Sequence, residues 1–225
     1  MRKIISVILK IIISVASLLG IILSFFRATP DGYSHWSKRL LYFTAQSNVW
    51  IGILSLIMLI YALAEGDKGS TRVKNTLYLL KYVFTVSITV TCLIFCVVLA
   101  PGSANENYNA WTFPSLITHV IVPALSIADL FVDEYKIALK KRHIFYTAIP
   151  PFLYMIFSTV LYLCRVDFGR GDPFPYFFLN FGSPAGVFGF SDEMPYMIGS
   201  FYWIVFILFI ILGFASLYKK LYKKK

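Results

Sequence analysis

Residues 4–26 read IISVILKIIISVASLLGIILSFF, an apolar run of 23 residues with one charged side chain, Lys10. At a rise of about 1.5 Å per residue, a helix of this length covers about 35 Å, enough for the hydrocarbon core of a bilayer. The run also exceeds the apolar segment of a secretory signal peptide, so we expect it to be kept as a membrane span. This stretch therefore indicates a membrane protein.

Five similar runs follow it along the chain. Each reaches about 20 residues, and they cover residues 40–64, 77–99, 114–133, 144–163 and 196–218. Backbone groups in lipid must bond within their own segment, which favours helices. The sequence predicts an all-α, polytopic membrane protein in which residues 1–225 form a single domain, a compact bundle of six transmembrane helices.

The composition excludes other classes of protein. Hydrophobic residues make up 58% of the chain and charged residues 14%, with a mean hydropathy of +0.72. A soluble domain of this size would lack the polar side chains to cover itself. Three cysteines without a C-x-x-C pair predict neither a disulfide scaffold nor a zinc site.

The distribution of lysine and arginine predicts the orientation. Of 21 such residues, 14 fall at the termini and in the second and fourth connections, and five fall in the first and fifth connections. Cytoplasmic segments retain these residues, so we place both termini in the cytoplasm. This asymmetry and a basic tail at 219–225 beside lipid headgroups account for the net charge of +10, and no nucleic-acid partner is predicted.

Two features depart from regular spans. Residues 164–195 combine four prolines with eight aromatic rings, which is too apolar for a free loop. We expect this segment to form a lid over the bundle or an aromatic belt at the membrane interface. Pro123, Pro150 and Pro151 fall inside spans, where proline kinks helices and opens cavities between them.

Polar side chains inside the spans are the candidate functional groups. Thr44, Ser47 and Asn48 share one helical face at the start of the second span, and His119 lies in the fourth span with Ser115 one turn before it. Both spans enter from the outside, and the two residues lie at depths of about 6 Å (Thr44) and 7.5 Å (His119). A hydroxyl and an imidazole at matched depth can act as nucleophile and general base. The alternative is that these groups hydrogen-bond within and between helices.

The residues that carry this pattern resemble a known family. Residues 42–48 (YFTAQSN), residues 119–123 (HVIVP) and Asp129 are similar to the androgen-induced-protein family of integral-membrane hydrolases, which includes the bacterial Pr-six-Pr branch. The resemblance extends over the six spans and implies Thr44 as nucleophile and His119 as its partner, acting on fatty acid esters of hydroxy fatty acids. The chain departs from the family at Leu130, often Trp in the bacterial branch, and at residues 173–180 (PFPYFFLN).

Secondary roles follow for the remaining polar groups. Asn48 and Gln46 are candidate oxyanion donors, with helix–helix bonding as the alternative, and Ser47 and Ser115 are candidate supports. Asp129 is too far along the helix to orient His119 and is expected to pair with a lysine near the inner face. We expect Lys10 and Lys81 to extend toward water. No metal or organic cofactor is predicted.

The sequence thus favours an intramembrane lipid ester hydrolase whose substrate reaches it from the bilayer. Cationic side chains at the outer rim, namely Lys38, Arg39, Arg165 and Arg170, are candidates to attract a carboxylate group. There are two alternatives. The protein is a small-molecule or ion transporter that uses the same polar residues, or it is a non-catalytic scaffold. The composition fits a bacterial plasma membrane and is compatible with the endoplasmic reticulum. It predicts no particular oligomeric state.

Overall fold

The structure, a computed structural model, describes residues 2–65, 69–102, 109–169 and 171–222. Within these ranges, six helical segments are long and apolar enough to cross a membrane, and no β-strand forms beyond an isolated bridge between Phe190 and Ile198. The predicted all-α fold with six spans is confirmed. Lys68, Arg170 and the lysines at 223–225 lie outside the described residues.

Three of the six spans are single helices and three are composite. The single helices are α1 (Arg2–Phe26), α2 (Phe43–Glu65) and α9 (Ser200–Leu221). The third span comprises α3 (Thr71–Ile94), the π-helical turn η3 (Phe95–Leu99) and α4 (Ala100–Gly102). The fourth comprises α5 (Phe113–Leu116), the π-helical turn η5 (Ile117–Ile121) and α6 (Val122–Val132), and the fifth comprises α7 (Lys141–Tyr146) and α8 (Ile149–Leu163).

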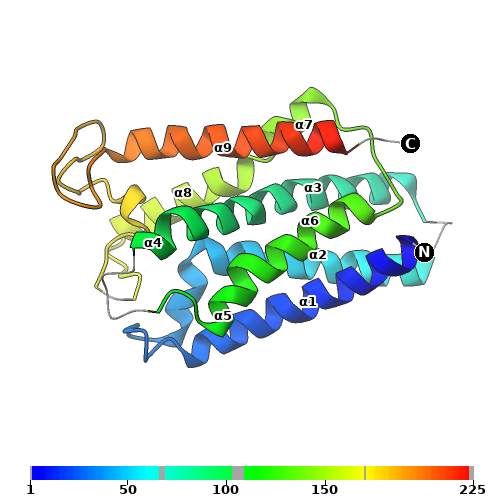
Figure 1. Cartoon of the computed structure of the whole chain (residues 1–225), viewed down its shortest axis with the longest axis horizontal. Coiled ribbons are helices and arrows are strands. Elements are labelled where there is room, and N and C mark those ends of the chain that lie inside the picture. Colours follow the sequence, from blue (N-terminus) through cyan, green and yellow to red (C-terminus); the bar gives the residue numbers. More distant parts are fainter. Residues whose placement is uncertain (1, 66–68, 103–108, 170, 223–225) are drawn as a thin grey trace.

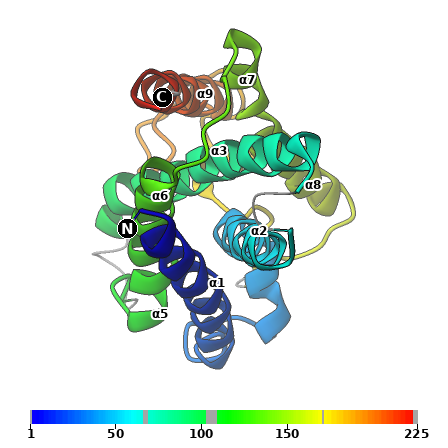
Figure 2. The same cartoon turned by 90° about the vertical axis from the view of Figure 1, so that its right-hand side faces the viewer.

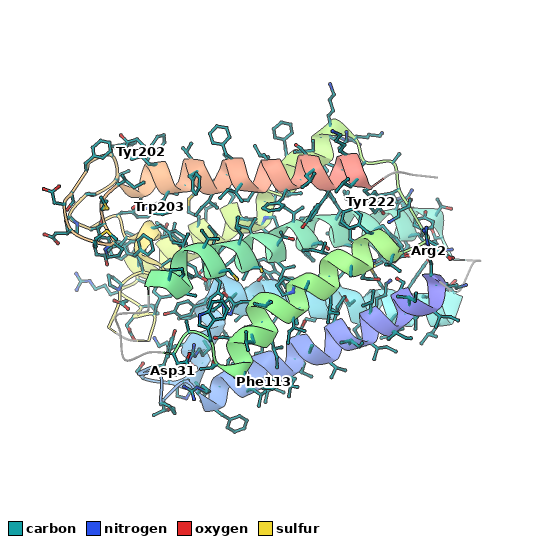
Figure 3. The ribbon with its side chains drawn as sticks, in the orientation of Figure 1. Arg2, Asp31, Phe113, Tyr202, Trp203 and Tyr222 are labelled. Atoms are coloured by element: carbon teal, nitrogen blue, oxygen red, sulfur yellow. The ribbon has the colours of Figure 1, made fainter. Side chains whose placement is uncertain are left out.

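Both ends of the described chain lie at the same end of the bundle (Figure 1). Figure 3 shows Arg2 and Tyr222 there, with Asp31, Phe113 and Tyr202 toward the opposite end. An even number of crossings explains this arrangement. Following the predicted orientation, we call the end with Arg2 the inner end and the opposite end the outer end.

Helix α3 is the centre of the bundle (Figure 2). It packs against α2, α6, α8 and α9, and it is the most buried of the six spans. Helix α1 packs against α2 and α6 on one side. The spans α7–α8 and α9 lie at the periphery and are the least buried. The outer halves of α2, α3 and the fourth span therefore meet beneath the outer loops.

Two prolines explain the two π-helical turns. A proline ring clashes with the carbonyl four residues earlier, and its missing N–H leaves that carbonyl without a partner. Pro123 follows His119 by four residues, and Pro101 follows Val97 by four. The affected turns widen, so that the Val122 N–H bonds to the Ile117 carbonyl and the Ala100 N–H bonds to the Phe95 carbonyl, each five residues back.

The fifth span is broken where Pro150 and Pro151 were expected to kink it. Helix α7 ends at Tyr146, Thr147 and Ala148 form a tight turn, and α8 begins at Ile149. Both prolines lie in the first turn of α8, where a missing N–H costs least. The break lets α7 and α8 follow different directions.

Several helix starts differ from the predicted spans. Helix α2 begins at Phe43 rather than at residue 40, because residues Trp36–Leu41 form a 3₁₀-helix, η1, that ends at an extended Tyr42. Thr44 consequently lies in the first turn of α2. Helix α3 begins before the apolar run, at Thr71 after an N-terminal Ser70. Helix α9 begins at Ser200, four residues later than predicted, after the turns that follow Phe190.

The connection between α8 and α9 divides into two parts. Its first part folds over the outer end of the bundle: Phe168, Phe174 and Phe178 are buried, and the 3₁₀-turn η6 (Phe177–Leu179) packs on α9. In the second part, Phe188 and Phe190 are exposed. The first part therefore covers the outer end of the bundle, and the second part leaves aromatic rings exposed.

A buried ionic cluster ties three helices together near the inner end. Lys10 of α1 and Lys81 of α3 both pair with Asp129 of α6 and with Asp133 just beyond it, at 2.7–3.1 Å. The Tyr78 hydroxyl also donates to Asp133, at 2.8 Å. The expected lysine partner of Asp129 is thus confirmed. The expectation that Lys10 and Lys81 extend toward water is wrong, because two carboxylates neutralise them inside the bundle.

Replacing Asp129 by Ala is expected to lower the free energy of unfolding by about 3–5 kcal/mol. The change leaves two buried ammonium groups to share one carboxylate, and an uncompensated buried charge is costly. Denaturant unfolding in detergent measures the effect, with Glu134→Gln at an exposed neighbour as the matched control. The double variant Lys81→Met/Asp129→Leu is expected to regain most of the loss. A loss below about 1 kcal/mol in Asp129→Ala would contradict this assignment.

Candidate active site

The structure brings Thr44 and His119 together at the outer end of the bundle. Thr44 Oγ1 lies 3.2 Å from His119 Nε2, although the two residues are 75 positions apart. Thr44 comes from the first turn of α2 and His119 from the π-helical turn η5, and both side chains are half-buried. The sequence predicts only that the two residues lie at the same depth below the outer membrane surface. The fold brings their side chains into contact.

The hydrogen bonds of His119 fix its tautomer. Its Nδ1 lies 3.0 Å from the backbone carbonyl oxygen of Ser115, an atom that can only accept. Nδ1 therefore carries the proton and donates it to Ser115, and Nε2 is the acceptor for the Thr44 hydroxyl. This arrangement has the polarity that a general base requires.

The imidazole ring of His119 also stacks on an aromatic ring. Phe95, the first residue of the other π-helical turn, stacks on it with centroids 3.8 Å apart and an angle of 19° between planes. The two widened turns thus place the imidazole and the ring that supports it. Sequence analysis did not identify Phe95; the available signal was the position of Pro101 relative to Phe95, which matches that of Pro123 relative to Ile117.

Asn48 and Ser47 hold the backbone around Thr44. The Asn48 side chain is fully buried and donates to the carbonyl oxygens of Thr44, at 2.8 Å, and Thr118, at 3.0 Å. Ser47 donates to the Thr44 carbonyl at 3.1 Å and contacts Thr91 of α3. Both hydrogens of the Asn48 amide are used in this way, so its predicted role as an oxyanion donor is wrong and the helix–helix alternative applies.

Of the other two predicted supporting residues, Ser115 contacts His119 and Gln46 does not. Gln46 points away from the site and donates to the Leu40 carbonyl at 3.3 Å, so it is also not an oxyanion donor. The reason is its spacing, because two residues of an α-helix place Gln46 and Thr44 on opposite faces. Ser115 does support His119, through its backbone carbonyl.

Tyr176 completes the surroundings of Thr44. It belongs to the segment that covers the outer end, and its ring packs against Tyr42 and Tyr154 and stacks on Phe178. Burial raises the pKa of Tyr176 to about 12, although hydrogen bonding to the side chain and backbone of Thr44 opposes the rise. The phenol stays protonated at neutral pH and can act as a donor. Residues 173–180 depart from the family's segment, and nothing in the sequence singles out this tyrosine.

Two cavities of different character meet at Thr44. The outer cavity, about 200 Å³, has a mixed lining whose polar groups include Thr44, Ser115 and His119. The second, about 390 Å³, is lined almost entirely by apolar side chains between α3, α8 and α9. Thr44 and Tyr176 line both. A bound molecule can therefore present a polar group on one side of Thr44 and an apolar chain on the other.

Two arginines give the outer cavity an excess positive charge. Arg27 and Arg39 both pair with Asp31, Arg27 at 3.0 Å, and Arg39 also lies over the Tyr33 ring at 4.1 Å. Of the other rim candidates, Lys38 is bonded to Asp167. Burial raises the pKa of Asp167, but the N–H groups of Gly169 and Gly171, together with Lys38, lower it by more, so the net shift is downward. Arg165 is exposed and does not line this cavity, and Arg170 lies outside the described residues.

Comparisons of the chain with protein-family models, with curated proteins and with solved structures find no match. Within the described residues, no three histidine, cysteine or carboxylate side chains gather in the manner of metal ligands.

Proposed function

We propose that this protein is an intramembrane hydrolase of lipid esters, with Thr44 as nucleophile and His119 as general base. The observation that carries the proposal is the contact between the Thr44 hydroxyl and the acceptor nitrogen of His119, at the junction of a partly polar and an almost entirely apolar cavity. A hydroxyl is a poor nucleophile until a neighbouring base takes its proton. The resemblance of residues 42–48 and 119–123 to the androgen-induced-protein family supports the same assignment.

The reaction follows from the hydrogen-bond polarity. Thr44 Oγ1 attacks the ester carbonyl carbon while its proton passes to His119 Nε2. The tetrahedral intermediate collapses, the ester C–O bond breaks, and the departing alkoxide takes the proton from Nε2. A water molecule then attacks the acyl-threonine, gives its proton to Nε2, and releases the fatty acid as Thr44 Oγ1 recovers that proton. Throughout, the Ser115 carbonyl accepts from Nδ1 and stabilises the transient imidazolium, a role that a carboxylate has in serine hydrolases.

Two groups are positioned to stabilise the developing oxyanion. Thr44 lies in the first turn of a 23-residue helix, whose N-terminal N–H groups favour negative charge. The protonated Tyr176 hydroxyl lies beside Thr44 and can donate a further hydrogen bond. These donors take the place predicted for Asn48 and Gln46.

The transporter alternative has less support. It requires Thr44, Asn48, His119, Lys81 and Asp129 to line one polar path. Lys81 and Asp129 instead pair with each other near the inner end, and the Asn48 amide is bonded to two carbonyls. No observation favours that function over ester hydrolysis.

The proposal is tested by ester hydrolysis with the purified full-length protein in lipid vesicles. A panel of esters varies acyl length and the presence of a free carboxylate on the alcohol part. Fatty acid release from at least one long-chain ester, saturating with substrate concentration, is the expected result. Absence of hydrolysis across the panel by folded protein would contradict the proposal.

Arg39→Gln is expected to raise KM for esters with a free carboxylate by about 10–100-fold, with neutral esters unaffected, because a hydrogen bond to a charged group contributes about 1.5–3 kcal/mol. Asp31 keeps Arg27 as its partner in this variant. The control is Arg165→Gln, an exposed outer-side arginine that does not line the cavity. Equal losses for neutral and anionic esters would show that Arg39 does not recognise the anion.

A further inference from the structure

The spans α8 and α9 hardly touch each other along their length. Helix α9 packs against α3, and it meets the fifth span mainly at α7, near the inner end. At the outer end it packs against η6. Figure 2 shows α7 beside α9 and α8 set apart from it. Between these two points of contact the helices leave a gap on the membrane-facing side.

The apolar cavity occupies the space behind this gap. Phe152 of α8 and Leu208 of α9 line the cavity and are also 56% and 40% exposed. In a membrane span, exposure means contact with lipid tails. The cavity therefore opens sideways to the bilayer, between these two side chains.

The cavity extends inward from the candidate active site. Thr44 and Tyr176 mark its outer end, and Ala148 and Pro151, at the start of α8, lie toward its inner end. Val90 and Leu99, both in the wall formed by the third span, are nine residues apart, which is about 13 Å along a helix. The space is thus elongated along the membrane normal, parallel to the lipid chains outside it.

The break at Pro150 and Pro151 accounts for the opening. A continuous helix from Lys141 to Leu163 would keep α8 in line with α7, which packs on α9. The tight turn at Thr147 and Ala148 redirects α8, and the residues at the break line the resulting space. The course of the backbone at this turn thus contributes to the gap between α8 and α9.

We propose that this cavity binds a lipid acyl chain that enters from the bilayer between α8 and α9, and that Ala148 limits the chain length. The inference rests on the proposed function for what happens at Thr44, but the binding itself requires no catalysis. Lipid tails are the molecules that adjoin the opening. The lining offers an acyl chain packing contacts and almost no polar groups to desolvate. An acyl chain in the cavity would present its carboxyl end beside Thr44.

Photolabelling tests the binding site directly. The full-length Thr44→Ala variant in lipid vesicles is irradiated with a long-chain fatty acid that carries a diazirine at its terminal carbon, and the labelled residues are mapped by mass spectrometry. We expect labels on the inner lining, at Ala148, Pro151 and Ile211, and competition by an unlabelled fatty acid. Labels confined to bilayer-facing residues such as Ile156 and Phe209, without competition, would overturn the inference.

Chain-length selectivity provides a second measurement. Ala148→Phe fills the inner end and is expected to shift the ratio of kcat/KM for long over short acyl esters downward by about tenfold or more, as a methylene-sized misfit in an apolar pocket does. Leu208→Trp, at the opening, is expected to slow long-chain esters more than short ones. Leu217→Trp, on the exposed face of α9 away from the cavity, is the matched control. Unchanged selectivity in Ala148→Phe would overturn the role of that residue.

The outcomes separate this inference from the proposed function. Labelling of the cavity by a protein that hydrolyses no ester in the panel would contradict the hydrolase and leave the acyl site standing. Ester hydrolysis that depends on Thr44, combined with labels only outside the cavity, would do the reverse.

Discussion

Thr44→Ala is expected to reduce ester hydrolysis on the order of 10⁴-fold or more, because it removes the atom that forms the acyl intermediate. The substitution removes little else. The Thr44 carbonyl still accepts from Ser47 and Asn48, so the first turns of α2 keep their links to α3 and to the fourth span. The loss should therefore appear in kcat, with a circular-dichroism spectrum and thermal stability close to those of the wild type. Initial rates on the best ester of the panel provide the measurement.

Thr44→Ser is the matched control for this prediction. Serine keeps the hydroxyl at the same distance from His119 and loses only a methyl group, so it should retain a substantial part of the activity. A Thr44→Ala variant with more than about a tenth of wild-type activity would show that the hydroxyl is not the nucleophile.

His119→Ala is expected to lower kcat about 10²–10⁴-fold, the contribution of a positioned general base. The same change removes the ring that stacks on Phe95, so some loss of stability accompanies it. His119→Phe separates the two effects, because it keeps an aromatic ring beside Phe95 and removes the acceptor nitrogen. It should be as inactive as His119→Ala but more stable.

His35→Ala is the control histidine variant. His35 lies in the first outer loop, where it caps η1 and contacts Ser37. It does not line the outer cavity, so its loss should leave kcat near the wild-type value. Equal effects of the two histidine variants would contradict a specific role for His119.

Much of the fold follows from hydropathy and charge. Runs such as residues 4–26 allow one solution in lipid, a helix, and their number determines the architecture. Hydropathy predicts the ends of the helices less accurately than their number. Hydropathy does not distinguish the 3₁₀-helix at Trp36–Leu41 from the span that follows, so the start of α2 was expected three residues early.

The candidate pair was predictable for a simpler reason. Thr44 and His119 each lie a few residues below the same predicted membrane surface. They therefore come together if the second and fourth spans are neighbours in the bundle. The groups that support this pair are harder to predict from the sequence. The roles of Asn48 and Gln46 depend on which face of α2 meets the fourth span, and Tyr176 reaches Thr44 only because its loop folds inward.

The ionic cluster illustrates a limit of residue-by-residue rules. Each of Lys10 and Lys81, taken alone, is expected to extend toward water. Both are buried because Asp129 of α6 and Asp133 just beyond that helix pair with them. Prolines were more informative, since Pro123 and Pro150 mark positions where the backbone departs from a regular helix.

The role of Thr44 as a nucleophile activated by His119 is tested most directly by covalent labelling with a fluorophosphonate, with the modified residue identified by mass spectrometry. The reagent is applied to the full-length protein in lipid vesicles, and it phosphonylates a hydroxyl only when a neighbouring base activates it. We expect one phosphonylated residue, Thr44, and loss of that adduct in His119→Ala with retention in His35→Ala. A folded protein that forms no adduct at Thr44, or an adduct that persists without His119, would contradict it.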